Sequence, residues 1–593
     1  MQSETFMTGS WNYSRLFLLA FALAFFLMAT LTRLNIPLAE WDHVILSAAE
    51  DWSRGIDRAW LFDHPPLYPS VLALVFHVFG SGAAVARAVN IAFVLLTALC
   101  VYRFTAKVFS PTAAFWALIV YLMNPVTIQG VSSLDMADTS MLPLLFLLTA
   151  IALRNLNARP TFGRMWVAGL CLGLCLWAKI TSTIAWMTAL GAATGVLWLL
   201  GERKSMMRLG YCLAAGISIG LATYLASSYQ ILNGLWGGEA FFWPLKAAYT
   251  AFMDRGGPDG QATVWSILYS MARIVVWFSP YFLLFFWGAV GASIKEFVSS
   301  RSDENRFHLW IGIAAVAYFL VHVVIGGTNW GFPRYHSAVS PIVCVLCGRF
   351  ISGSMPARGM RGQFVFGSAI AVTAIITATF LPDPIHFLSI RAKQMLLNHE
   401  GFLQLMGQAL VVFLPLYGLS LLVALFVFRA QNQTTDKKAW GLFLTVGLLA
   451  TTFSMDLQHA VASYRTTVQY GAAGKEELVK SVRAHLLPGD RVLAAPEFIY
   501  ELRDLNVPRV SWEELRSRER FHGFVKQYSP MAIIGGLTVS SLDQLGWMLS
   551  KETGSFLSKT YRPHRVGTYY YWLREDAGRA HASYDIQKET WRP

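Results

Sequence analysis

Two aspartates, Asp42 and Asp138, stand at the edges of long apolar segments, where a carboxylate is costly to keep. Asp42 follows the first apolar segment, in the run Glu40-Trp41-Asp42-His43, and Asp138 stands at the start of the fourth. A carboxylate near lipid has a raised pKa unless a cation or a metal is close, and a raised pKa suits a general base. The placement of both acids therefore predicts chemistry at one face of a membrane.

Each aspartate also has a simpler interpretation. The loop that carries Asp42 contains tryptophans, and these residues anchor solvated loops at a membrane surface. Asp138 opens an apolar helix, where an acid is a favourable cap. Asp135, one turn earlier, is an alternative to Asp138 as the second acid of a shared site. The sequence leaves these alternatives open.

Two cations, Lys179 and Arg334, lie at the boundaries of other apolar segments. Each side chain either extends to the lipid–water interface or pairs with a lipid phosphate. Acids and cations on one face suit a displacement at a sugar carbon whose leaving group is a lipid phosphate. In such a reaction a carboxylate takes the proton of the acceptor, and cations stabilise the departing phosphate.

Long apolar helices are the elements that would position these side chains. The chain has 593 residues, of which 55% are hydrophobic and only 14% are charged, too few charges for a soluble protein of this length. Apolar runs near the length of a bilayer recur through most of the chain, which predicts a polytopic α-helical membrane protein. The net charge of +13 does not indicate nucleic acid, because most Lys and Arg residues stand in short loops that orient helices.

The apolar runs predict about thirteen transmembrane helices within a membrane domain of residues 1–457. They are expected near residues 15–33, 70–103 (with or without an interfacial piece first), 111–129, 138–154, 165–181, 183–200, 208–231, 265–294, 308–326, 335–352, 363–381, 403–428 and 440–457.

The loops between these segments alternate in charge. Every loop after an even-numbered segment is basic, as Arg103 and Lys107 are after the second, which predicts that these loops are cytoplasmic. The other loops are then outside, including the longer segments 34–69, 232–264 and 382–402. Long outer loops between helices are unusual unless they have a function.

The C-terminal tail, residues 458–593, differs in composition and is expected outside the membrane. It contains a helix-like stretch at Lys475–Leu487 and short apolar stretches at 491–495, 531–535 and 568–572. Helices that alternate with strands predict a small α/β domain. The tail has no GxGxxG motif after its first strand, so we expect no nucleotide there.

Taken in order, these pieces resemble the GT-C membrane glycosyltransferases related to protein O-mannosyltransferases and lipid A aminoarabinose transferases. The resemblance covers about residues 15–350 and, more loosely, the tail. The pieces that carry it are Asp42, His64-Pro65-Pro66-Leu67, Gly80, Ala86-Arg87, Asp138 before Leu144-Leu145-Phe146, Lys179, and Arg334-Tyr335 before Pro341.

The resemblance implies an inverting transfer of a sugar from a polyprenyl-phosphate donor to a glycan, lipid or protein acceptor. The reaction would occur at the periplasmic or extracytoplasmic face of the inner (plasma) membrane. Asp42 would be the catalytic base or the acid that positions the acceptor, and Asp138 would support it. The implied donor-phosphate ligands are Lys179, Arg334 and Tyr335, and the implied cavity-lining residues are Glu40, His43, His64 and Asp135.

The chain also departs from the pattern of the family. Members often have Glu directly after the first aspartate and an aromatic residue soon after, whereas His43 and Leu46 stand here. Some relatives bind a divalent metal ion, but the residues assign no metal ligands in this chain. The alternatives are a transporter or flippase of a lipid-linked glycan, which would place polar residues near mid-membrane, and a membrane scaffold whose tail binds a partner. No motif in the sequence identifies the sugar, the acceptor or the oligomeric state.

Overall fold

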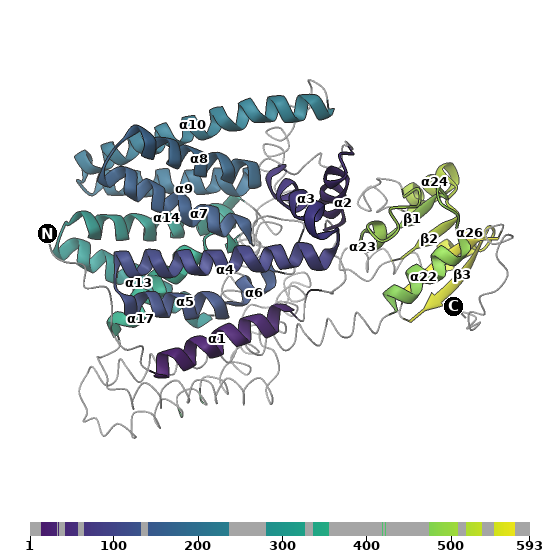
Figure 1. Ribbon diagram of the computed structural model, residues 1–593, viewed down its shortest axis with the longest axis horizontal. Helices are drawn as coiled ribbons and strands as arrows, with labels where there is room; N and C mark the ends of the chain where they lie inside the picture. The colour runs from purple at the N-terminus through teal and green to yellow at the C-terminus, as the bar shows by residue number, and fades with distance from the viewer. Residues whose placement is uncertain are drawn as a thin grey trace.

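A helical bundle and a smaller sheet-containing domain make up the part of the chain that the structure describes (Figure 1). The computed structural model describes residues 13–31, 34, 42–56, 65–131, 134, 140–236, 280–325, 336–354, 418, 422, 474–507, 518–535, 551–567 and 569–575. The C-terminal domain lies beyond one end of the bundle, next to helices α2 (Asp42–Ser53) and α3 (Leu67–Phe79). We call this end the α2 end and the opposite one the basic end.

Apolar helices form the bundle, because lipid requires each backbone polar group to be satisfied within the segment. Among the described helices, four are long and apolar enough to cross a membrane: α4 (Ala83–Val108), α7 (Met141–Ala158), α9 (Ile180–Leu199) and α10 (Arg203–Trp236), the last over Arg203–Ala226. They pack with α1 (Tyr13–Leu31), α5 (Pro111–Met123), α6 (Pro125–Gly130), α8 (Phe162–Ala178), α13 (Pro280–Ser299), α14 (Asp303–Ile325) and α17 (Ser340–Ser354). The protein is therefore a multi-pass membrane protein.

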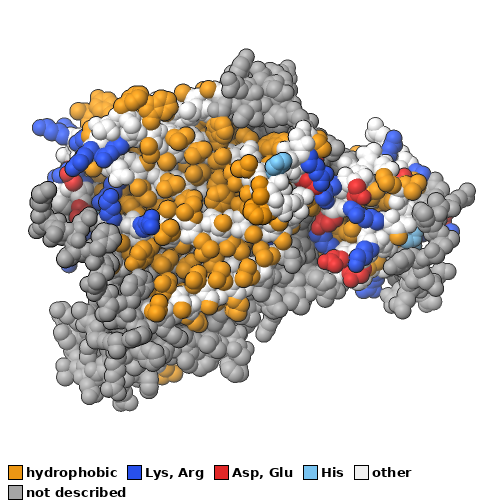
Figure 2. Space-filling model, in the orientation of Figure 1, with side chains coloured by type: hydrophobic (Ala, Val, Ile, Leu, Met, Phe, Trp, Pro, Cys, Tyr) orange, Lys and Arg blue, Asp and Glu red, His pale blue; other side chains and the backbone are white. Residues whose placement is uncertain are grey.

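The surface of the bundle has the polarity of a membrane protein. Figure 2 shows hydrophobic side chains in a band across the helices, with Lys and Arg at the basic end and again where the bundle meets the C-terminal domain. Large apolar side chains such as Leu74, Phe162 and Leu199 are 72%, 71% and 85% exposed. Apolar side chains exposed over so wide an area indicate a surface that faces lipid rather than water.

The boundaries of the helices refine the sequence predictions. The segment expected at 70–103 divides into helices α3 and α4, separated by a turn in which Gly80 has a φ of +83°. The segment expected at 111–129 divides at Asn124, whose side chain accepts a hydrogen bond from the N–H of Val126 at 3.0 Å. Pro125 follows directly, and proline disfavours helical backbone in the residue before it.

Two further differences concern the loops and the count of helices. The outer segment 34–69, expected as a loop, contains helix α2 and the start of α3. The number of about thirteen transmembrane helices stays a prediction, because the segments expected near 363–381, 403–428 and 440–457 lie almost wholly outside the described residues.

Helices α8 and α10 approach each other closely through small residues. Gly169 and Gly173 on α8 face Gly216 and Gly220 on α10. On each helix the two glycines are four residues apart, which is the GxxxG spacing. A Cβ atom added to Gly220 would lie only 2.9 Å from the backbone nitrogen of Gly173. This packing fixes the end of α8, where Lys179 follows.

The C-terminal domain contains a four-stranded mixed sheet with strand order β1-β2-β4-β3. Its elements are α22 (Lys475–His485), β1 (Val492–Ala494), α23 (Pro496–Ile499), α24 (Arg518–Tyr528), β2 (Ala532–Ile534), α26 (Lys551–Leu557), β3 (Tyr561–Val566) and β4 (Tyr569–Arg574). Strands β1 and β2 are parallel and wholly buried, whereas β4 pairs antiparallel with both β2 and β3. Strands β1, β2 and β4 coincide with the three apolar stretches of the tail, and β3 was not anticipated because half of its side chains are exposed.

Candidate functional site

Asp42 is the first residue of helix α2 and is buried, with 1% of its side chain exposed. Its Oδ1 atom accepts a hydrogen bond of 2.8 Å from the backbone N–H of Leu134. Its Oδ2 atom lies 3.9 Å from a guanidinium nitrogen of Arg87 on α4. The carboxylate therefore joins α2 to α4 and to the loop that leads toward Asp138.

Arg87 is the cation that the sequence-based prediction for Asp42 allowed for. Its side chain is 0% exposed, and it also donates a hydrogen bond of 2.8 Å to the carbonyl oxygen of Leu34. A buried ion pair is retained at a cost in desolvation, so the chain keeps these two charges at the α2 end for a structural or functional reason.

Asn90, one turn after Arg87 on α4, forms hydrogen bonds with three further segments of the chain. Its Oδ1 atom accepts hydrogen bonds from the hydroxyls of Tyr68 at 2.6 Å and Ser140 at 2.8 Å. Its amide nitrogen donates to the carbonyl oxygen of Val131 at 3.2 Å. Because residues three apart share one face of a helix, the same face of α4 holds α2, α3 and both ends of the loop between α6 and α7.

Lys179 lies between helices α8 and α9, in extended backbone with φ −162° and ψ 112°. Its carbonyl oxygen accepts a hydrogen bond of 2.6 Å from the hydroxyl of Thr183, and its side chain is half-buried. Helix α8 leads from the basic end, so Lys179 lies at the α2 end of the bundle, as Asp42 does.

Several candidate residues from the sequence lie wholly or partly outside the residues that the structure describes. His43 lies in helix α2, but its side chain is outside what the structure describes. Other residues of the expected site lie entirely outside the described residues, namely Glu40, His64, Asp135, Asp138, Arg334 and Tyr335. Their roles stay predictions. Among the described residues, no group of three or more His, Cys, Asp or Glu side chains is arranged to hold a metal ion.

Sequence reasoning missed Asn90 altogether and noted Arg87 only as part of a family pattern. A signal for both was present, because an arginine and an asparagine three residues apart in an apolar helix form a polar patch within the membrane. What the sequence could not give was the partner of each, since these partners come from segments up to 53 positions away.

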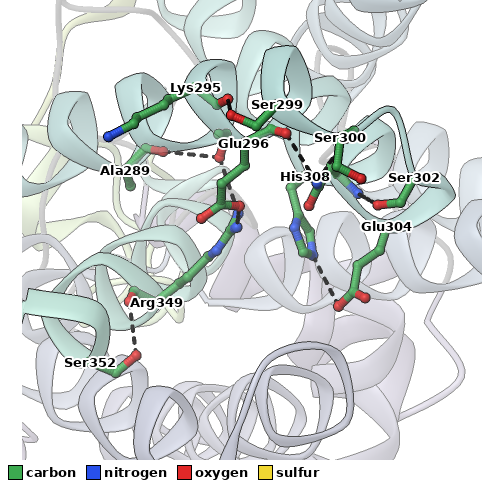
Figure 3. Close-up of polar contacts among 12 residues, drawn as sticks. Ala289, Lys295, Glu296, Ser299, Ser300, Ser302, Glu304, His308, Arg349 and Ser352 are labelled. Atoms are coloured by element: carbon green, nitrogen blue, oxygen red, sulfur yellow. Dashed lines mark hydrogen bonds and ion pairs between the residues drawn. The ribbon is translucent and has the colours of Figure 1, made fainter.

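A second polar cluster lies at the basic end (Figure 3). Arg349 on α17 forms an ion pair with Glu296 on α13. The side chain of Asn305 donates to the carbonyl oxygens of Glu296 at 3.2 Å and Ser300 at 2.9 Å. His308 on α14 lies 4.0 Å from Glu304. These contacts tie together the ends of α13, α14 and α17, and we assign them a structural role.

Comparison with known proteins identifies the class of protein to which this bundle is similar. Residues 63–228 match the model of the dolichyl-phosphate-mannose-protein mannosyltransferase family. This segment runs from just before α3 into α10 and includes Tyr68, Arg87, Asn90 and Lys179. A comparison with curated proteins gave no match.

The fold is shared with solved structures along almost the whole chain. The structure of ArnT from Cupriavidus metallidurans bound to undecaprenyl phosphate is 17% identical, with 94% of this chain and 97% of that chain covered and a TM-score of 0.59. The apo structure of the same protein is 16% identical over the same shares, with a TM-score of 0.57. The apo oligosaccharyltransferase of Archaeoglobus fulgidus is 12% identical, covers 89% of this chain and 70% of that one, and has a TM-score of 0.48.

These matches confirm the resemblance to GT-C superfamily glycosyltransferases of the mannosyltransferase and ArnT type. At this level of identity, the structural match establishes the fold. The chemistry has to be argued from the side chains at the α2 end.

Proposed function

We propose that this protein is an inverting membrane glycosyltransferase that moves a sugar from a polyprenyl-phosphate donor to a glycan, lipid or protein acceptor. One observation carries the proposal: a buried carboxylate, Asp42, is held between a buried arginine and a backbone N–H at the α2 end. The fold that holds it is the fold of ArnT, which has been solved with undecaprenyl phosphate bound.

Asp42 acts as the general base or as the acid that positions the acceptor. An ionised carboxylate is the form that accepts a proton from an attacking hydroxyl or amine. Arg87 supplies the positive charge that compensates this carboxylate in a buried site, and the N–H of Leu134 fixes its orientation. The proposed second acid, Asp138 or Asp135, follows Leu134 closely in the sequence.

Lys179, with Arg334 and Tyr335, binds the phosphate of the donor. Lys179 lies at a break between two helices, where the side chain of a cation can turn toward a lipid headgroup. As the bond between sugar and phosphate breaks, negative charge grows on the departing polyprenyl phosphate. Fixed cations stabilise that charge and so lower the barrier.

The reaction takes place at the outer, extracytoplasmic face of the inner (plasma) membrane. The Lys and Arg residues of the short loops gather at the opposite end of the bundle, and basic loops are typically cytoplasmic (Figure 2). The C-terminal domain, which lies at the α2 end, is then extracytoplasmic as well.

An assay of the purified protein tests this function. The protein in lipid nanodiscs is incubated with a panel of undecaprenyl-phosphate sugars and with candidate acceptors, and release of undecaprenyl phosphate is measured. We expect release that depends on both donor and acceptor. Movement of a lipid-linked sugar across a liposome membrane without any such release would instead favour a flippase.

A further inference from the structure

The C-terminal domain contacts the bundle through residues that follow the short helix α23. Tyr500 and Arg503 reach helix α2, and α23 packs against the same helix. Tyr500 is only 6% exposed and packs with the apolar core of the bundle rather than with the core of its own domain. The two parts of the protein are therefore joined by side chains that are specific to this contact.

Glu50 on α2 is the polar centre of the contact. Its Oε1 atom accepts a hydrogen bond of 3.0 Å from Nη2 of Arg503, and its Oε2 atom lies 2.8 Å from Nε of the same guanidinium as an ion pair. Only 2% of the Glu50 side chain is exposed, against 35% for Arg503. Two nitrogens of one guanidinium held against the two oxygens of a buried carboxylate fix direction as well as distance, so this contact sets the orientation of one domain on the other.

Tyr500 completes this arrangement. The guanidinium of Arg503 lies over the ring of Tyr500, 4.1 Å from its centroid, and also donates to the carbonyl oxygen of Tyr500 at 2.7 Å. Burial raises the pKa of Tyr500 to about 12, so its hydroxyl stays protonated at neutral pH. This hydroxyl lies near Glu50 and Ser81, the residue in the turn between α3 and α4, but makes no hydrogen bond among the described residues.

Helix α2 carries this contact to the candidate site. Asp42 begins the helix and Glu50 follows eight residues later, about 12 Å further along the axis. The first turn is fixed to Arg87 and Leu134, and the third turn is fixed to the C-terminal domain. A helix held at both ends has little freedom to shift or rotate, and the position of Asp42 is fixed with it.

We propose that Glu50, Tyr500 and Arg503 form a latch through which the C-terminal domain fixes helix α2 and so positions Asp42 for transfer. These three residues are positioning residues, and none of them acts on the substrate itself. The latch rests on the proposed function for its effect on turnover. Its effect on the mobility of α2 does not depend on that function.

The test removes the two arginine partners of the Glu50 carboxylate one at a time. Arg503→Met removes the contact between the domains, whereas Arg54→Met removes the exposed arginine directly after α2 that also pairs with Glu50. Arg503→Lys keeps the charge and loses the paired geometry. Hydrogen–deuterium exchange of residues 42–53 is measured in nanodiscs for each variant, together with kcat and KM for the undecaprenyl-phosphate sugar that the wild type uses.

We expect faster exchange over 42–53 and a fall in kcat of about 10- to 100-fold in Arg503→Met, with KM for the donor little changed. Arg54→Met should behave as the wild type, and Arg503→Lys should lie between. Equal exchange in Arg503→Met and Arg54→Met would overturn the latch. Faster exchange with unchanged kcat would overturn its positioning role.

The outcome also separates the latch from the proposed function. If the wild type releases no undecaprenyl phosphate from any donor, the proposed function fails. The exchange measurement still decides the latch, because a rise confined to the Arg503 variants upholds it and the absence of a rise contradicts it.

Discussion

The two ends of the bundle use the same kinds of residue in opposite ways. At the α2 end, Asp42, Arg87 and Asn90 are at most 1% exposed, and their partners come from distant parts of the chain. At the basic end, Arg306 pairs with Asp303, which is 89% exposed, and with Glu202. The polar residues around Asp42 are therefore more deeply buried than the ion pairs of Arg306, although both sets carry charge.

This difference decides what each set of charges can do. Exposed ion pairs are screened by water and add little to stability, so the charges at the basic end serve mainly to orient the helices. Buried polar groups are costly unless their partners are in place, and they specify one arrangement of the segments that they join. The α2 end can therefore hold reacting groups in a fixed geometry, which catalysis needs.

The largest expected loss of stability comes from Arg87→Met. This substitution leaves the carboxylate of Asp42 buried beside an apolar side chain, and removal of one partner of a buried pair costs about 3–5 kcal/mol. Thermal unfolding of the protein in detergent checks it. A loss below about 1 kcal/mol would place the pair in the same class as the exposed pairs of the basic end.

A smaller loss is expected from Asn90→Leu. The hydroxyls of Tyr68 and Ser140 and the carbonyl of Val131 would each lose their hydrogen bond with Asn90, for a total cost of about 2–3 kcal/mol after relaxation. Tyr68→Phe is the matched control, because it removes one of the three hydrogen bonds. If the two substitutions act through the same network, the double variant should lose less than the sum of the single losses.

Acid should weaken the latch. Burial alone raises the pKa of Glu50, but Arg503, Tyr500 and Arg54 outweigh it and hold that pKa below its ordinary value of 4.5. A carboxyl whose pKa is lowered on docking stabilises the docked state above its ordinary pKa, and this stabilisation is lost as the pH falls through the lowered value. Hydrogen exchange of residues 496–507, corrected for intrinsic rates, should rise over that range in the wild type. The Glu50→Gln variant should show no such dependence, and an identical pH profile in both proteins would contradict the assignment.

The smallest effect is expected from Arg306→Met at the basic end. Its pairs with Glu202 and Asp303 are partly exposed, so the loss should be about 0–1 kcal/mol and should shrink further in high salt. Thermal unfolding at two salt concentrations measures it. A loss as large as that of Arg87→Met would remove the distinction between the two ends.

The sequence predicted the parts of this fold that depend on local pattern. Long apolar runs marked the helices, and the alternation of basic loops marked the two ends. The break between α3 and α4 was left open, and helix α2 was missed because a 12-residue segment with several polar side chains resembles a surface loop. Strand β3, with exposed arginines and a proline, was missed because it lacks an apolar pattern.

The candidate site was harder to predict, because its geometry depends on tertiary contacts. Asp42 was singled out from its position alone. Its contacts with Arg87 and Leu134 follow from how α2, α4 and the loop before α7 come together, which no local pattern encodes. The latch between Glu50 and Arg503 joins positions that are 453 residues apart.

The most direct test is the turnover of the Asp42→Asn variant against that of Glu296→Gln. Both substitutions remove one charge and keep the shape of the side chain, one at the buried α2 end and the other at the basic end, where Glu296 is 42% exposed. With undecaprenyl phosphate release measured per amount of folded protein, Asp42→Asn should lose about 10²- to 10⁴-fold in rate, whereas Glu296→Gln should stay near the wild type. Full turnover in Asp42→Asn would contradict the assignment of Asp42 as the catalytic or acceptor-positioning acid.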